Sequence, residues 1–319
     1  MNKIIICSVI ISLIIVSTSF IILMDAYIVF YDPNWIGIIN NENNNKKLES
    51  KIMLLGSSSA YAVNATSINE KLLINNYDFH FYNLADMSDT PKKRLKTFSN
   101  VLSHEPQLIL YGIGVYDFEN YKPKIVEDKF QNYILDPQFF FRNSFQDLLG
   151  NELNEEFPLS PKDRVLTFLK YVLRGPDYHY HPFINFSPTP INSFETIEKI
   201  HGKTRDFNKI DMSDNNLQIL ALKQIIRDSE INNIKIILFT NPNSKIINDT
   251  IESNELKKFE NSLVNLAEEN NIPLIFLHDK FSEMNIWRDP LHIAIHPDAN
   301  IFTNEISNIL LEELRNNAV

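Results

Sequence analysis

Short apolar runs that alternate with helix-length amphipathic stretches constrain the fold of this chain more than any other feature of its sequence. Five runs have the length of β-strands and are bounded by turn residues, at 51–55, 79–84, 107–111, 234–239 and 272–277. Helical patterns lie at 64–75, 91–104, 214–230, 254–270 and 298–316. Strand alternating with helix predicts an α/β protein, a three-layer α/β/α sandwich with a five-stranded parallel sheet. Ligands of such sheets bind outside the carboxyl ends of the strands, so functional residues are expected just after the apolar runs.

The segment at 4–24 is an uncharged apolar run, long enough to cross a bilayer as one helix. Lys3 precedes it and Asp25 follows it, so the positive-inside rule predicts a cytoplasmic amino terminus and an extracellular remainder. A cleaved signal peptide is the alternative, because the small residues at 17–19 could form a cleavage site. We therefore predict a transmembrane anchor, or a signal peptide, over residues 1–24.

The rest of the chain divides into a polar linker and one domain. Residues 25–50 end in an asparagine-rich stretch typical of a solvated juxtamembrane linker, which leaves 51–319 as the domain. An aromatic-rich insert at 118–213 interrupts the alternation of strand and helix. The insert is either a small subdomain that uses its rings as its own core, or a cap whose rings contact sugars or acyl chains.

Composition excludes several classes of protein. The chain has 40 acidic and 30 basic side chains and a net charge of −10, so it lacks the positive footprint that binds nucleic acid. Its single cysteine, Cys7, can form neither an internal disulfide nor a cysteine-rich zinc site. Asp177, His179 and His181 alternate like metal ligands but belong to no larger cluster. No metal, no cofactor and no nucleic-acid partner are therefore expected.

Serines follow the first apolar run, and an aspartate and a histidine precede the last helix. The Gly-Ser-Ser-Ser segment at 56–59 suits a strand-to-helix turn, where a hydroxyl points out of the sheet and the helix amino terminus stabilises an oxyanion; it also suits a plain turn. Asp289 lies three residues before His292 and can accept the ring Nδ1–H, so that Nε2 faces a nucleophile as general base. His296 is the weaker candidate base, since the residue three before it is an isoleucine.

These residues resemble the catalytic blocks of the SGNH, or GDSL-like, hydrolase superfamily. The family's Gly-Asp-Ser block after the first strand is matched by Gly56-Ser57-Ser58, with serine in place of aspartate. Its Asp-x-x-His block before the last helix is matched by Asp289 and His292. The resemblance implies an SGNH or flavodoxin-like sheet and a triad of Ser58, His292 and Asp289.

Two further blocks of the family supply the oxyanion hole, which binds the charged oxygen of the tetrahedral intermediate. The Asn-x-x-x-x-Gly-x-Thr block is matched at 83–90, with Ser88 in the glycine position. The Gly-x-Asn-Asp block is matched at 114–117, with Tyr116 in place of the asparagine whose side chain donates a hydrogen bond. The resemblance implies that backbone N–H groups of Ser58 and Ser88, together with Tyr116, hold the oxyanion.

Two other segments beside the expected site have open roles. Asn241-Pro242-Asn243 follows the fourth apolar run, and it either lines a substrate pocket or is an ordinary proline turn. Trp287 and Arg288 precede the aspartate, and they either pack the histidine loop or hold a substrate.

The resemblance implies a serine esterase or O-acyltransferase. Membrane-anchored relatives that move or remove acyl groups on cell-surface polymers often lack the strict first and third blocks, as this chain does. The partners implied are the membrane, through the amino-terminal helix, and an acyl ester, such as an acetyl ester, of an extracellular glycan or lipid. The alternative is a weakly active or inactive surface domain that binds glycan through its aromatic insert.

Overall fold

A computed structural model of the 319-residue chain describes residues 11–12, 15–16, 19–20, 50–86, 89–119, 189–201 and 209–316. The strands and helices named below belong to one of the chain's two compact units, which spans Ile38–Tyr121 and Tyr178–Val319. Of the other unit, only the residues at 11–12, 15–16 and 19–20 are described, and they are helical.

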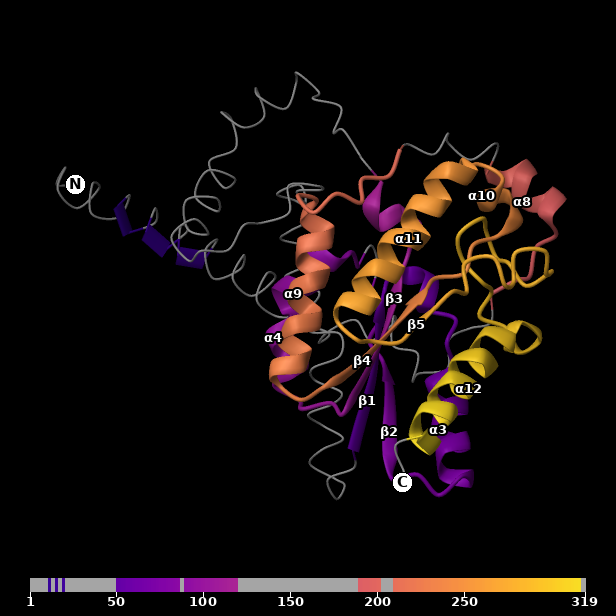
Figure 1. Cartoon of the computed structure of the whole chain (residues 1–319). Coiled ribbons are helices and arrows are strands. Elements are labelled where there is room, and N and C mark those ends of the chain that lie inside the picture. The colour runs from indigo at the N-terminus through magenta and orange to yellow at the C-terminus, as the bar shows by residue number, and fades with distance from the viewer. Residues whose placement is uncertain are drawn as a thin grey trace, which may run out of the picture. The chain divides into compact units, whose positions relative to one another are not determined.

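Five parallel strands form one sheet in the order β2-β1-β3-β4-β5 (Figure 1). The strands are β1 (Ser50–Gly56), β2 (Phe79–Asn83), β3 (Leu108–Ile113), β4 (Lys235–Thr240) and β5 (Leu274–Ile275). Side chains on both faces of the central strands β1, β3 and β4 are buried, as expected of a parallel sheet covered on both sides. The five-stranded parallel sheet predicted from the sequence is confirmed.

The fifth strand is shorter than the apolar run at 272–277. β5 pairs with β4 over two residues only. Beyond it, the N–H of Leu277 donates to Thr240 Oγ1 at 2.7 Å, and the N–H of His278 donates to the same oxygen at 3.1 Å. The strand ends there because a side-chain hydroxyl takes the place of the next backbone acceptor.

Helices lie on both sides of the sheet (Figure 1). Two contacting helices, α3 and α12, lie on one side, and two others in contact, α4 and α9, lie on the opposite side. The bounds are α3 (Ala65–Ile74), α4 (Pro91–Leu102), α8 (Phe194–His201), α9 (Leu217–Ile231), α10 (Lys245–Asn248), α11 (Ser253–Glu269) and α12 (Ile301–Asn316). The five longest lie where the five helical patterns of the sequence predict them, with ends that differ by a few residues.

The core on the α3 side joins the first and last thirds of the chain. Ile52 and Leu54 of β1 belong to the same buried cluster as Leu72 of α3 and Ile306 and Leu310 of α12. Each of these side chains is at most 1% exposed. Burial of such side chains contributes on the order of 1.5–3 kcal/mol each, which holds the carboxyl-terminal elements against the first strand.

Several predictions concern residues outside the described ranges. Within those ranges, no helix is long and apolar enough to span a membrane. Most of the apolar run at 4–24, nearly all of the linker at 25–50 and most of the insert at 118–213 are not described, so the anchor, the linker and the cap stay predictions. The metal-like pattern at 177–181 also lies outside. Among the described residues, no group of three or more His, Cys, Asp or Glu could hold a metal ion.

Candidate active site

Ser58 lies just beyond the carboxyl end of β1, where the chain turns into a short 3-10 helix, η1 (Ser58–Ala60). The turn requires glycine at position 56, because Gly56 has φ +146° and a Cβ there would lie 2.9 Å from the carbonyl oxygen of Gly112. Gly112 is the partner of Gly56 on β3, so the two strands end in close backbone contact. Ser58 therefore lies at the edge where parallel sheets bind their ligands.

Ser58, His292 and Asp289 form a continuous chain of hydrogen bonds. Ser58 Oγ lies 2.8 Å from His292 Nε2, and His292 Nδ1 lies 2.7 Å from Asp289 Oδ1. An ionised carboxylate can only accept, so Nδ1 carries the ring proton and the lone pair of Nε2 faces the serine hydroxyl. The structure brings together the three residues that the sequence predicts as nucleophile, base and orienting acid.

Asp289 is held by its neighbours in the same loop. Its Oδ1 accepts hydrogen bonds from the backbone N–H groups of Leu291 and His292, each at 3.0 Å. Its Oδ2 accepts a hydrogen bond from Nε of Arg288 and forms an ion pair with Nη2 of the same side chain, each at 2.9 Å. Burial acts to raise the pKa of Asp289, but the hydrogen bond and charge of His292, with the bonds from Leu291 and Arg288, hold that pKa well below its ordinary value. The carboxylate is therefore ionised throughout the neutral pH range.

The loop at 287–293 is fixed to the core. Trp287 is fully buried and forms a backbone bridge with Ile293 at the other end of the loop. The buried hydroxyl of Ser244 donates to the carbonyl oxygen of Pro290 at 2.6 Å. Trp287 therefore packs the histidine loop against the core, which is one of the two roles that the sequence left open.

His296, the alternative base, caps a turn instead. It precedes η4 (Pro297–Ala299), and its Nδ1 accepts a hydrogen bond from the N–H of Asp298 at 3.1 Å. The ring that contacts Ser58 is that of His292. The preference for His292, which rested on the aspartate three residues before it, agrees with this geometry.

The segment after β2 is tied to the serine turn, although Ser88 itself lies outside the described residues. The N–H of Asp86 donates to the carbonyl oxygen of Gly56 at 2.9 Å. The buried side chain of Asn83 donates to two carbonyl oxygens in the 60–63 segment, each at 3.0 Å. Residues 83–86 therefore lie against the turn that carries Ser58, and the oxyanion role of Ser88 stays a prediction.

Tyr116 lies half-buried in η2 (Val115–Phe118), the 3-10 turn that follows β3. Asp117 closes this turn, since its Oδ2 accepts a hydrogen bond from the N–H of Gly114 at 2.7 Å. The turn thus holds the third block of the sequence pattern at the carboxyl end of β3. The oxyanion role of Tyr116 also stays a prediction.

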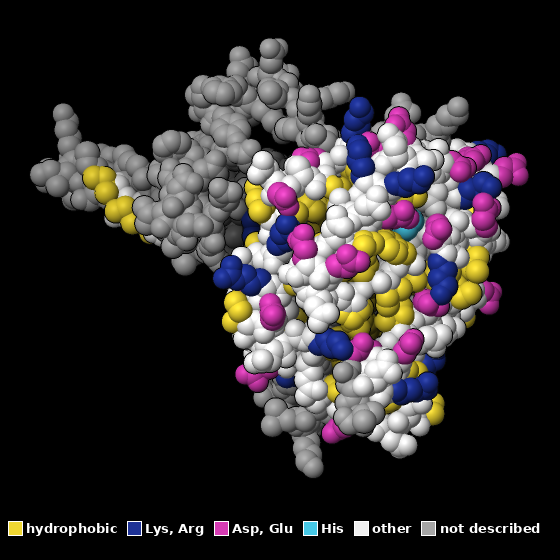
Figure 2. Space-filling view, in the orientation of Figure 1, with side chains coloured by type: hydrophobic (Ala, Val, Ile, Leu, Met, Phe, Trp, Pro, Cys, Tyr) yellow, Lys and Arg dark blue, Asp and Glu magenta, His cyan; other side chains and the backbone are white. Residues whose placement is uncertain are grey.

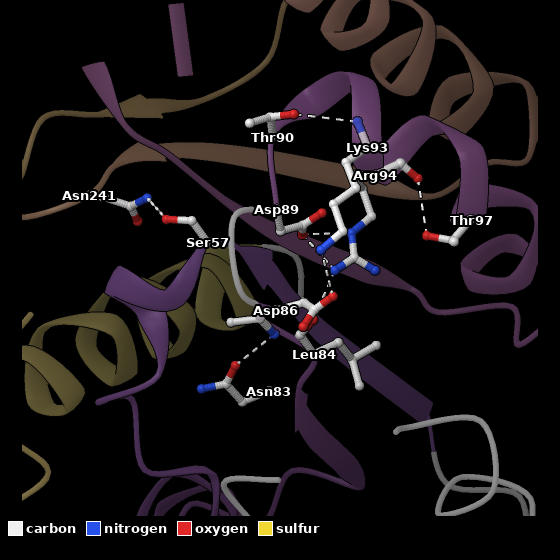
Figure 3. A network of polar contacts seen from close by, with 11 residues as sticks. Ser57, Asn83, Leu84, Asp86, Asp89, Thr90, Lys93, Arg94, Thr97 and Asn241 are labelled. Carbon is white, nitrogen blue, oxygen red and sulfur yellow. Dashed lines mark hydrogen bonds and ion pairs between the residues drawn. The ribbon is translucent and has the colours of Figure 1, made fainter. Parts of the chain in front are cut away.

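Two carboxyl groups with raised pKa values lie near this turn. Arg94 donates to Asp89 Oδ2 from Nε at 2.8 Å and from Nη2 at 2.5 Å, and both side chains are buried (Figure 3). Burial raises the pKa of Asp89 to about 6, although the charge of Arg94 opposes it. Burial raises the pKa of Asp117 to about 7, although the hydrogen bond from Gly114 opposes it. Nothing in the sequence indicates that either carboxyl has a raised pKa.

Comparisons with known proteins give similarities of structure. No family model and no curated protein matches the chain. The psychrotrophic esterase EstA from Pseudoalteromonas sp. is 14% identical with a TM-score of 0.42, over 84% of this chain and 100% of that chain. A lipolytic protein of the G-D-S-L family from Desulfitobacterium hafniense is 12% identical with a TM-score of 0.40, over 82% and 99%. A variant of Axe2, an acetylxylan esterase from Geobacillus stearothermophilus, is 11% identical with a TM-score of 0.33, over 72% and 77%.

Two residues at the site have contacts that the sequence left open. Arg288 binds Asp289 directly. Asn241, at the end of β4, directs Nδ2 toward Ser57 Oγ at 3.4 Å (Figure 3). The position of Asn241 just after an apolar run indicates from the sequence that it lies near the site. The sequence does not indicate which strand lies beside β4 or which residue the side chain contacts.

Proposed function

We propose that this chain is a serine ester hydrolase of the SGNH type. In this proposal Ser58 is the nucleophile, His292 is the general base and acid, and Asp289 orients the imidazole and stabilises its protonated form. The observation that carries the proposal is the hydrogen-bonded chain from Ser58 through His292 to Asp289, at 2.8 and 2.7 Å. The depressed pKa of Asp289 supports its role, because an ionised carboxylate is what stabilises an imidazolium.

The reaction would proceed in two steps. Ser58 Oγ bonds to the ester carbonyl carbon while its proton moves to His292 Nε2, and the intermediate then expels the alcohol, which takes that proton. Water attacks the acyl-enzyme with the same histidine as base, which releases the acid and restores the serine. In this proposal, backbone N–H groups of Ser58 and Ser88 stabilise the charged oxygen in both steps.

We extend the proposal to the substrate and its location. The substrate would be an acyl ester, such as an acetyl ester, of an extracellular glycan or lipid, and the domain would be held at the membrane by the anchor at 1–24. The support is the apolar run at 4–24 with Lys3 before it, and the aromatic-rich insert. Transfer of the acyl group to a sugar hydroxyl differs from hydrolysis only in the acceptor, which is a sugar instead of water. Incubation of the protein with an acetylated polysaccharide, with and without an acceptor sugar, would distinguish the two reactions.

A fluorophosphonate probe tests the nucleophile. The wild-type chain should be labelled and Ser58→Ala should not, because the probe bonds to the activated oxygen. Ser59→Ala is the matched control, one residue away in the same turn, and it should still be labelled. Labelling of Ser58→Ala, or a folded wild-type chain that never reacts, would contradict the proposal and favour a domain that only binds glycan.

A further inference from the structure

Asn241 is a buried amide at the carboxyl end of β4. Gly56, Gly112 and Phe239 form one row across β1, β3 and β4. Two residues beyond this row, the N–H of Asn241 still donates to the carbonyl oxygen of Ile113 at 2.8 Å, so β4 keeps its contact with β3. The backbone of Asn241 is thus fixed beside β3, level with the turn that follows β1.

Gly112 on β3 and Gly114 just beyond its end leave room for the side chain of Asn241. A Cβ at Gly112 would lie 2.5 Å from Asn241 Oδ1, and a Cβ at Gly114 would lie 3.7 Å from Asn241 Nδ2. The amide therefore occupies space that a side chain at Gly112 would fill. Its Nδ2 lies 3.4 Å from Ser57 Oγ (Figure 3). Ser57 precedes Ser58 in the chain, so the amide lies one residue away from the proposed nucleophile.

The side-chain amide of Asn241 makes fewer and longer hydrogen bonds among the described residues than a buried amide usually does. The contact with Ser57 is longer than the usual ~2.9 Å of an N–H···O bond. Oδ1 is buried and has no hydrogen-bond partner among the described residues, and the whole residue is 2% exposed. Burial of an under-satisfied amide costs free energy, and such groups in folded proteins require an explanation.

We propose that Asn241 is a catalytic residue that donates a hydrogen bond from Nδ2 to the oxyanion formed at Ser58. This inference rests on the function proposed above. When Ser58 Oγ bonds to the carbonyl carbon, its proton moves to His292 Nε2 and the carbonyl electron pair moves onto oxygen, while no bond to Asn241 forms or breaks. A charge-assisted bond to that oxygen is stronger than the long bond to Ser57, so the amide binds the transition state better than the ground state.

Steady-state kinetics on a p-nitrophenyl ester test the inference. Asn241→Leu has a similar volume and no donor, so we expect kcat to fall about 10²- to 10³-fold, with KM changed less than about threefold because substrate binding is not affected. Asn241→Ala is a second variant in case leucine disturbs the packing. Asn248→Ala is the control, since Asn248 is a half-buried amide on α10 that contacts His278 and belongs to neither the triad nor the serine turn, and it should keep the wild-type kcat. A folded Asn241 variant with kcat near that of wild type would overturn the inference.

Two more variants separate this inference from the function on which it rests. Ser58→Ala measured in the same assay should lose activity, and retained activity would defeat the proposed function itself. If Ser58→Ala is inactive and Asn241→Leu is fully active, only the role of Asn241 fails. Tyr116→Phe identifies the competing donor, because a loss of kcat in that variant with none at Asn241 would assign the oxyanion to the tyrosine hydroxyl.

A structure of the wild-type phosphonate adduct tests the geometry without a substitution. The phosphonyl oxygen stands where the oxyanion would lie, and Asn241 Nδ2 should lie about 2.7–3.1 Å from it. A phosphonyl oxygen directed instead at the hydroxyl of Tyr116, with the amide still on Ser57, would overturn the inference.

Discussion

At the scale of single residues, the two oxygens of Asp289 have different partners. Oδ1 accepts from the ring and the backbone N–H of His292 and from the N–H of Leu291, whereas Oδ2 accepts from Arg288. Three donors therefore converge on the oxygen that faces the base. The orientation of the carboxylate is fixed by the loop itself before any substrate arrives.

Asp289→Asn should impair catalysis strongly. The backbone N–H groups that donate to Oδ1 require an oxygen at that position, so the NH₂ group of the new amide would face the donors of Arg288. The neutral amide would also no longer stabilise an imidazolium. We expect kcat on a p-nitrophenyl ester to fall about 10²- to 10⁴-fold. Asp298→Asn, an exposed aspartate next to His296, should leave the rate unchanged. A rate of Asp289→Asn within about tenfold of wild type would contradict the assigned role.

At the scale of elements, the site depends on how closely β1 and β3 approach at their carboxyl ends. Gly56 and Gly112 are paired, and each has backbone or side-chain atoms too near for a Cβ. Gly114 is different, because its nearest neighbour would be 3.6 Å from an added Cβ, which is ordinary contact. A side chain is therefore tolerated at Gly114, just beyond the end of β3, and not at Gly56 or Gly112.

Gly56→Ala should destabilise the protein by about 1–3 kcal/mol, because alanine is strained at φ +146° and its methyl would meet the backbone of Gly112. Gly114→Ala is the control and should change the free energy of unfolding by less than about 0.5 kcal/mol. Urea unfolding followed by circular dichroism measures both. Equal stability of the two variants would show that the turn after β1 does not depend on glycine.

The sequence predicted the strands, the helices and the three triad residues better than it predicted contacts between neighbouring strands. Strands and helices follow from periodicity, and the pair Asp289 and His292 follows from local spacing. The choice of Ser58 among three consecutive serines follows from the resemblance to the SGNH family. The structure brings these three side chains together. The reach of Asn241 over β3 could not be predicted, because it depends on strand order rather than on neighbours in the chain. β5 was predicted too long because the hydroxyl of Thr240 replaces a backbone acceptor.

At the scale of the whole molecule, surface charges and buried charges have different effects on stability. Figure 2 shows acidic and basic side chains interspersed over the face that it displays. Exposed ion pairs such as Lys245 with Glu283, at 2.9 Å, are screened by solvent and contribute little. The carboxyl groups of Asp89, which is buried, and of Asp117, which is half-buried, have raised pKa values, so their ionisation should contribute to how stability changes near neutral pH.

The stability that Asp89 and Asp117 contribute should fall as the pH rises from about 4 to about 7. The folded-state pKa values of Asp89 and Asp117, about 6 and about 7, lie above the usual value, so the folded chain binds these protons more tightly than the unfolded chain. Their contribution is complete below about pH 4 and is lost as the pH rises through the folded-state values, by up to about 1.4 kcal/mol per pH unit for each carboxyl. Urea unfolding at pH 5 and pH 8 measures the difference.

Asp117→Asn should reduce that difference, because an amide cannot ionise and its oxygen can still accept from the N–H of Gly114. Asp228→Asn, a half-buried aspartate on α9, is the control and should leave the difference as in wild type. If Asp117→Asn loses as much stability between pH 5 and pH 8 as wild type does, the carboxyl of Asp117 is not the cause.

The contact between Ser58 and His292 joins residues 234 positions apart in the chain. During synthesis, the serine and its turn would leave the ribosome long before the loop at 287–293 exists. A chain interrupted between β5 and that loop would contain all five strands and would still have a serine without its base. The proposed hydrolase would thus remain inactive until nearly the whole polypeptide has been made and packed, so its activity would report completed folding.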